Sequence, residues 1–122
     1  MNRPVHFEIP ATNPEAIAAF YTDLFSWKIS SWGTPEMGYW MVDTGTDGPG
    51  INGGILRRRD KAQPAVNTIE VANLDAALEK AVAIGGRVCL PKMPIPTVGW
   101  LAYCSDPDGN IFGMMQNDPA AH

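Results

Sequence analysis

Asn13-Pro14-Glu15-Ala16 and Asn73-Leu74-Asp75-Ala76 are two similar stretches that stand 60 residues apart in this chain of 122 residues. Each begins with an asparagine, whose side chain can cap a helix, and then carries an acidic residue near the positive end of the helix dipole. Proline at the first helical position strengthens the first signal. Because the two stretches align without a gap, they predict two helices and a duplicated unit.

Apolar residues follow each cap at helical spacing. After the first cap they are Ile17, Phe20, Tyr21, Leu24 and Phe25, and after the second they are Leu74, Ala77, Leu78, Ala81 and Val82. Such a stripe predicts an amphipathic helix that packs one face against a sheet. Gly85-Gly86 marks the end of the second helix.

Short β-prone segments separated by turn residues surround each predicted helix. They cover residues 4–9, 28–32, 39–43 and 51–56 in the first half, and residues 65–71, 87–90, 100–105 and 110–116 in the second. Each half is therefore β-α-β-β-β, over about residues 3–57 and 64–117. The predicted fold class is α+β, a single domain over residues 1–122 with one helix on the outer face of each mixed sheet.

Composition excludes several classes of protein. The net charge is −4, and the one dense basic group, Arg57-Arg58-Arg59 with Lys61, is interpreted as a solvated surface, so nucleic acid is not an expected partner. No apolar run has the length of a membrane span, and residues 1–9 lack the layout of a secretory signal, so the expected location is cytoplasmic. Cys89 and Cys104 are expected to be reduced thiols.

The order of motifs resembles the vicinal oxygen chelate superfamily, which includes glyoxalase I, extradiol dioxygenases, fosfomycin-resistance proteins and bleomycin-binding proteins. The resemblance rests on four stretches: His6-Phe7-Glu8-Ile9, Ala19-Phe20-Tyr21, Ile69-Glu70-Val71 and Asp106-Pro107-Asp108-Gly109-Asn110. It implies paired βαβββ repeats whose sheets form a cup around a site, commonly in a homodimer.

Metal-dependent members of that superfamily usually hold the ion with a histidine on the first strand and a glutamate on the last strand of each half. His6 matches the first of these positions. The other three fall on Val66, Gly54 and Gly113, none of which has a ligating side chain. The resemblance therefore implies that no metal cofactor is bound at the family's position.

A rebuilt divalent metal site is the alternative. Strand alternation puts His6 and Glu8 on one face and Glu70 on the equivalent face of the second half, so one imidazole and two carboxylates are candidate metal-ligating or catalytic groups. The simpler interpretation is that both glutamates lie at a rim and that His6 is a hydrogen-bonded cavity residue.

The lost ligands leave apolar and aromatic residues as candidate walls of the cup. The candidates for ligand binding are Trp40, Trp100, Tyr103, Ile111, Met115 and Val66, with Tyr39 as a further wall residue. Flat aromatic surfaces suit planar ligands.

Two classes of function remain open. One is a metal-independent module that binds a small planar or aromatic molecule in the cup. The other is a lyase or isomerase of the glyoxalase or dioxygenase type that uses His6 with Glu8 or Glu70, with or without a divalent metal. Fold-level analogy alone does not decide between them.

Overall fold

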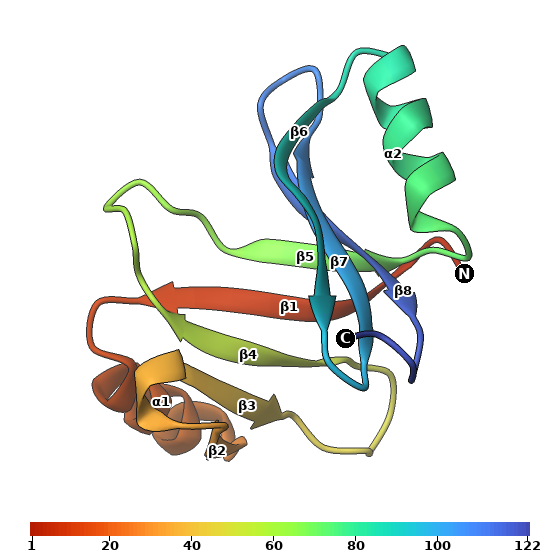
Figure 1. The fold of residues 1–122 in the computed structure, drawn as a ribbon. Coiled ribbons are helices and arrows are strands. Elements are labelled where there is room, and N and C mark those ends of the chain that lie inside the picture. The colour runs from red at the N-terminus through yellow and green to blue at the C-terminus, as the bar shows by residue number, and fades with distance from the viewer. The chain divides into compact units, whose positions relative to one another are not determined.

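The structure is a computed structural model that describes residues 1–34 and 36–122. Its secondary structure follows the order strand, helix, three strands, twice (Figure 1). The elements are β1 (Arg3–Ala11), α1 (Pro14–Phe25), β2 (Lys28–Trp32), the 3-10 turn η1 (Pro35–Met37), β3 (Tyr39–Asp43), β4 (Asn52–Arg57), β5 (Val66–Glu70), α2 (Leu74–Ala83), β6 (Arg87–Ile95), β7 (Gly99–Ser105) and β8 (Ile111–Asn117). The predicted α+β class and the two βαβββ repeats are confirmed.

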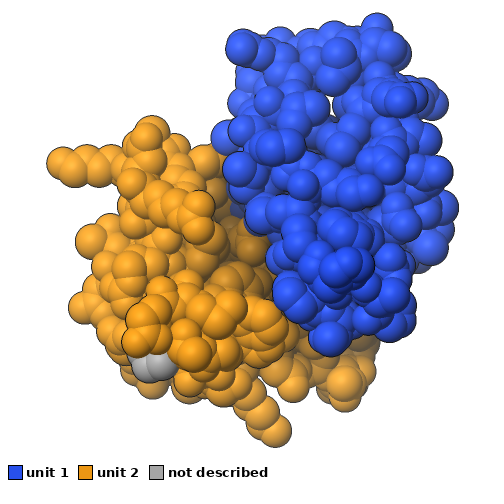
Figure 2. All heavy atoms as spheres, viewed as in Figure 1, with its two compact units in different colours: residues 1–5, 66–122 blue, residues 6–65 orange. Residues whose placement is uncertain are grey.

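The chain divides into two compact units, coloured separately in Figure 2. Unit 2, residues 6–65, has the strand order β2-β3-β4-β1, in which β1 pairs with β4 in parallel and the other pairs are antiparallel. Unit 1, residues 1–5 and 66–122, has the order β5-β8-β7-β6 with the same pattern of parallel and antiparallel pairs. The repeat seen in the sequence is therefore a repeat of strand pairing as well.

Both predicted caps form as expected. The Asn13 side chain accepts a hydrogen bond from the Ala16 amide, and the Asn73 side chain accepts one from the Ala76 amide. Helix α1 ends where Ser26 adopts a left-handed conformation, and after α2 the amide of Gly86 donates to the carbonyl of Ala81.

Strand β6 is longer than the sequence predicts. The prediction ended at Leu90, and the residues beyond it include Pro91 and Pro94, which lack amide hydrogens. The strand continues to Ile95 because it lies at the edge of the sheet of unit 1, where proline is tolerated, and because its register with β7 shifts twice between Val88 and Met93.

Each unit buries its core between its helix and one face of its sheet. In unit 2 this core contains Ala11, Val42 and Ile55, with Phe7 and Ile9 packed against it from β1. In unit 1 the buried core residues are Val71, Leu74, Ala102, Cys104 and Met114, and α2 lies along β6 to β8 (Figure 1). The opposite face of each sheet carries no helix of its own unit, and we call these the helix-free faces.

Both helices are short. Within the part of the chain that the structure describes, neither has the length and apolar character needed to cross a membrane.

Candidate functional site

The first strand places two titratable side chains on the helix-free face of unit 2. Phe7 and Ile9 point into the core beneath α1, so alternation turns His6 and Glu8 to the other face. The parallel register sets His6 opposite Asn52 and Glu8 opposite Gly54 on β4. Both side chains are half-buried.

Tyr39 connects these two residues. Its hydroxyl lies 2.7 Å from Nε2 of His6 and is also hydrogen-bonded to the Glu8 side chain. Because a carboxylate only accepts, the phenol donates to Glu8 and accepts from Nε2–H of His6. That assignment leaves the lone pair of the neutral imidazole on Nδ1. We call these three residues the His6–Tyr39–Glu8 cluster.

Burial sets the protonation state of the cluster. Desolvation lowers the pKa of His6 below its usual 6.5, and the nearby Glu8 carboxylate opposes this in part. Desolvation, followed by the charge and the hydrogen bond of Glu8, raises the pKa of Tyr39 well above its usual range. At neutral pH the cluster therefore contains a neutral imidazole and a neutral phenol.

Gly54 allows the tyrosine to reach this position. A Cβ at residue 54 would overlap the hydroxyl oxygen and ring carbons of Tyr39, far inside any real contact distance. Tyr39 pairs with Leu56 on β4, so its side chain runs along the strand and crosses directly over Gly54. The phenol thus fills the space above Gly54, the position at which the family resemblance implies a ligating glutamate in metal-dependent members.

The equivalent glycine of unit 1 is also in close contact. A Cβ on Gly113 would stand 2.8 Å from Oγ1 of Thr68 and 3.4 Å from Cε1 of Tyr103. Thr68 and Tyr103 are the register partners of Gly113 on β5 and β7, and Thr68 is buried. In both units, a glycine on the last strand therefore accommodates a polar or aromatic neighbour.

These residues do not fit the metal site that the superfamily implies. Among the residues that the structure describes, no three His, Cys, Asp or Glu side chains are grouped closely enough to hold a metal ion. In unit 2, Nε2 of His6 already donates to Tyr39, and Gly54 offers no ligand. A protein site for zinc or iron needs three or four ligands.

A pocket of about 370 Å³ lies on the same face of unit 2. It is lined by Lys28, Ile29, Ser30, Met41, Val42, Asp43 and Asn52. Cross-strand register brings Lys28 beside Asp43 and Ser30 beside Met41. Asn52, the β4 partner of His6, belongs to this lining, so the pocket and the His6–Tyr39–Glu8 cluster are neighbours.

The remaining predicted site residues lie on two different faces. Val66, Tyr103, Ile111 and Met115 share the helix-free face of unit 1, as alternation around Gly113 predicts. The carboxylate of Glu70 on that face accepts a hydrogen bond from the side-chain amide of Asn117. His6 and Glu8 come together in unit 2 through Tyr39, whereas Glu70 belongs to unit 1.

Trp40 and Trp100, expected as cup walls, lie on the helix-covered faces, and this corrects their predicted placement. Trp40 packs against the core of Val42 and Ile55, and Trp100 packs against the core that contains Leu74. The indole of Trp100 also donates to Asp118 at 3.0 Å. Each tryptophan is half-buried and packs against the core of its own unit.

Two residues on the helix-free face of unit 2 were not among the predicted site residues. Trp32 ends β2 opposite Tyr39, with the two rings edge to face, and Met41 lies opposite Gly54. Both side chains are 40% exposed. If the orientation of Tyr39 were known, alternation along β3 would place Met41 on the same face. The pairing of β2 with β3 would then place Trp32 there too.

A βαβββ unit present twice, with a parallel outer pair in each copy and polar side chains on the helix-free face, defines the glyoxalase-like class of folds. Sequence comparison agrees, because the model of the glyoxalase-like domain matches residues 5–115. The chain belongs to this family, and the resemblance to the vicinal oxygen chelate superfamily is confirmed.

The chain is also similar to curated proteins from mycobacteria. It is 28% identical over 117 residues to a protein of Mycobacterium tuberculosis named "Putative glyoxylase CFP32", and equally to the protein of that name from Mycobacterium bovis. These matches cover 93% of this chain but 45% of each relative. The chain thus spans about half the length of the curated relatives it matches.

Solved structures share the fold at low sequence identity. Hypothetical protein BH1468 from Bacillus halodurans superimposes with a TM-score of 0.69 at 12% identity, covering 98% of this chain and 97% of that one. Methylmalonyl-CoA epimerase from Mycobacterium tuberculosis gives 0.68 at 12% identity over 95% and 88% of the two chains. A glyoxalase/bleomycin resistance protein/dioxygenase superfamily member from Vibrio splendidus gives 0.65 at 13% identity over 94% and 98%.

Proposed function

We propose that this chain binds a small organic molecule with a planar or aromatic part, on the helix-free face of unit 2, without a metal ion. The observation that carries the proposal is the position of Tyr39. Its phenol fills the space above Gly54 and engages Nε2 of His6, the one family ligand position that the sequence retains. His6 and the space above Gly54, two of the four positions at which the family resemblance implies metal ligands, therefore belong to a hydrogen-bonded polar cluster.

The character of the surrounding face supports an organic ligand. Exposed Trp32 and Met41 offer an aromatic ring and a polarizable thioether for contact with a flat molecule. The neighbouring pocket adds polar groups from Lys28, Ser30 and Asp43. An apolar surface with a few convergent polar groups is the usual composition of a small-molecule site.

Elemental analysis tests the metal-independent part of the proposal. The protein is purified without chelator and assayed for zinc, nickel, iron, cobalt and manganese, alongside the Tyr39→Phe and His6→Ala variants. We expect less than about 0.1 metal ion per chain in all three, because one imidazole and water do not hold a divalent ion tightly. Near-stoichiometric metal that disappears in the His6→Ala variant would refute metal independence.

Thermal-shift screening tests the ligand. A molecule that binds only the folded chain raises its melting temperature. At a free concentration of one hundred times its Kd, it increases the free energy of unfolding by about 2.7 kcal/mol. Planar aromatic compounds should therefore stabilise the wild type but not the Trp32→Ala variant. The matched control is Phe20→Ala, since Phe20 is exposed on α1. Indifference of the wild type to every such compound would count against this binding face.

An enzyme of the lyase or isomerase type is the second candidate, and the His6–Tyr39–Glu8 cluster favours it. Burial keeps His6 neutral, with its Nδ1 lone pair available to accept a proton, while Glu8 holds the tyrosine in place. Proton exchange into α-hydroxy and α-keto carbonyl compounds in D₂O, followed by NMR, is the assay. Proton exchange that is lost in a His6 variant would show that the chain is an enzyme. No exchange with any of these carbonyl compounds would favour the binding function.

The proposal includes a homodimer, as the family resemblance implies, and a cytoplasmic location, as expected from the sequence. Both cysteines are free, with Cys104 buried and Cys89 exposed, which agrees with a reducing compartment. Sedimentation equilibrium measures the oligomeric state of the purified chain. Localisation of the tagged full-length protein by cell fractionation tests the compartment.

A further inference from the structure

Strand β2 is an outer strand of the sheet of unit 2, since it stands at the end of the order β2-β3-β4-β1. Among the residues that the structure describes, its backbone pairs with β3 alone. Four of its five residues are exposed. Such a strand presents unpaired N–H and C=O groups along its outer side. We call the outer side of this strand the β2 edge.

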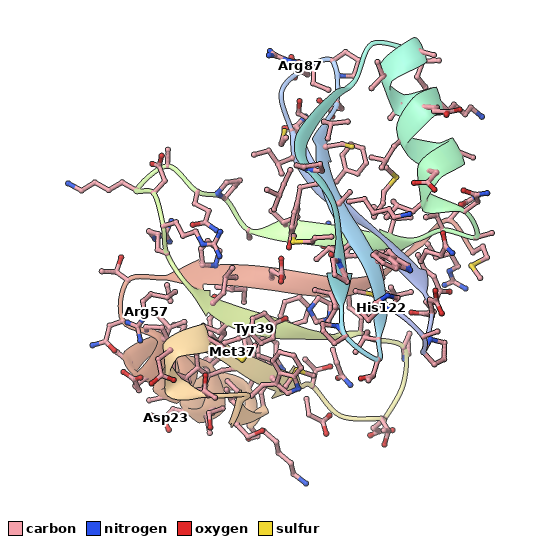
Figure 3. All side chains as sticks on the ribbon, viewed as in Figure 1. Asp23, Met37, Tyr39, Arg57, Arg87 and His122 are labelled. Carbon is pink, nitrogen blue, oxygen red and sulfur yellow. The ribbon has the colours of Figure 1, made fainter. Side chains whose placement is uncertain are left out.

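The equivalent strand of unit 1 is protected against further pairing. Strand β6 stands at the end of the order β5-β8-β7-β6, as β2 does in unit 2. It contains Pro91 and Pro94, which have no amide hydrogen to donate, and its register with β7 shifts twice. Arg87, labelled in Figure 3, adds a charge at its first position. Prolines, irregular register and charge are the means by which proteins block an exposed edge.

The β2 edge has neither prolines nor an irregular register. Its pairing with β3 is continuous from Lys28 to Trp32, and its one charged residue, Lys28, stands at the first position. Because β2 and β6 hold the same place in the repeat, the fold itself does not require an open edge. A regular edge of this kind is suited to pairing with another strand.

The side chains of β2 favour a second copy of the same strand as the partner. Two antiparallel β2 strands overlap over all five residues only when Ser30 lies opposite Ser30 of the partner subunit. In that register Lys28 lies opposite the partner's Trp32, and Ile29 lies opposite the partner's Ser31. No like charges face each other, so the strand is complementary to itself.

Lys28 and Trp32 lie on the helix-free face of unit 2. Trp32 pairs with Tyr39, which is labelled in Figure 3, and Lys28 pairs with Asp43 four residues further along β3, so alternation places both on one face. Nζ of Lys28 makes no hydrogen bond or ion pair with another residue that the structure describes. Its ammonium group is therefore available for a cation–π contact with the ring of the partner's Trp32.

We propose that two copies of this chain pair through the β2 edge, antiparallel and about a two-fold axis that passes between Ser30 and Ser30 of the partner subunit. The dimer is closed, because each copy uses its β2 edge once. The partner's Lys28 thereby joins Trp32 on the proposed binding face. The inference rests on the proposed function, since it assigns the interface of the proposed homodimer and adds a residue to that site.

Cysteine cross-linking tests the register. Ser30→Cys and Ser31→Cys are compared under oxidation with diamide in a Cys89→Ser background, which removes the exposed native thiol. Residues directly opposite each other have Cα atoms about 4.5–5.5 Å apart, within reach of a disulfide, whereas the offset Ser31 pair lies about 8 Å apart. We expect disulfide-linked dimer from Ser30→Cys and little from Ser31→Cys. Equal cross-linking of the two variants, or none with Ser30→Cys, would overturn the inference.

Sedimentation equilibrium tests the contact between Lys28 and the partner's Trp32. Lys28→Gln should weaken the dimer about tenfold, because each dimer loses two cation–π contacts. Lys28→Arg keeps a cation that stacks on aromatic rings and should change the affinity by less than about twofold. The matched control is Lys80→Gln, which removes the same charge from an exposed position on α2. Equal weakening by Lys28→Gln and Lys80→Gln would overturn the inference.

The aromatic compounds distinguish failure of this interface from failure of the proposed function. A monomeric chain that planar aromatic compounds still stabilise would overturn the interface and support the binding face. A dimer that neither cross-links through Ser30→Cys nor responds to Lys28→Gln would overturn the interface and support the homodimer. A dimer that cross-links through Ser30→Cys, but that no aromatic compound stabilises, would support the interface and count against the aromatic ligand.

Discussion

The hydroxyl of Tyr39 on β3 lies in the space that a side chain at Gly54 on β4 would occupy. The tyrosine can reach His6 and Glu8 on β1 only because the intervening strand has no side chain at that point. The glycine and the polar cluster are therefore parts of one arrangement across three strands.

Gly54→Ala should destabilise the protein by about 1–3 kcal/mol, the usual cost of forcing atoms into a packed site. The added methyl group collides with the phenol, which must swing away from His6. Urea denaturation measures the change in the free energy of unfolding. A double-mutant cycle with Tyr39→Ala is the control, since without the phenol the same methyl group should cost less than about 1 kcal/mol. Equal cost in both backgrounds would show that Tyr39 is not the obstacle.

The free energy of unfolding should fall as the pH drops below about 6.5, and His6 should contribute to this fall. Burial lowers the pKa of His6 in the folded chain, so the unfolded chain takes up the proton first and gains from it. The stabilising contribution of the neutral imidazole is complete above pH 6.5. It is lost as the pH falls through the pKa that His6 has in the folded chain. Urea denaturation between pH 7.5 and 5 should show a shallower slope for His6→Gln than for the wild type. The His122→Gln variant retains His6 and is the matched control, and identical slopes in all three proteins would contradict the assignment.

Tyr39 should ionise well above the usual pH range of a tyrosine. Burial and the adjacent Glu8 carboxylate both disfavour the phenolate, and the pKa of Tyr39 is raised accordingly. Absorbance at 295 nm follows ionisation during an alkaline titration, and circular dichroism at each pH identifies the range in which the chain remains folded. Tyr39→Phe should remove a phase that lies well above the ordinary range of tyrosine. Loss of a phase within the ordinary range instead would place Tyr39 in a more polar environment than the structure shows.

Local signals allowed the elements to be predicted, whereas the site depends on pairing between distant strands. The caps at Asn13 and Asn73 act within a few residues, so the sequence identifies both helix starts correctly. The contact between Tyr39 and Gly54 depends on the register of β3 against β4, which no short stretch encodes. Adjacent residues of a strand face opposite sides of the sheet, and the local pattern of β3 does not show which side faces the cup, so both Tyr39 and Trp40 were candidate wall residues.

The tryptophans should divide into structural and ligand-binding residues. Trp40→Ala and Trp100→Ala should each cost about 2–4 kcal/mol, because both half-buried rings pack against core residues on the helix-covered faces. Trp32→Ala should cost less than about 1 kcal/mol, since its ring is 40% exposed and covers no buried core residue. Chemical denaturation gives the three stabilities, and thermal shift with planar aromatic compounds gives the response to ligand. We expect the Trp40 and Trp100 variants to keep a ligand-dependent shift from their lower starting temperatures, and the Trp32 variant to lose it. If a Trp40 variant as stable as the wild type lost that response, the ligand would have to bind the helix-covered face instead.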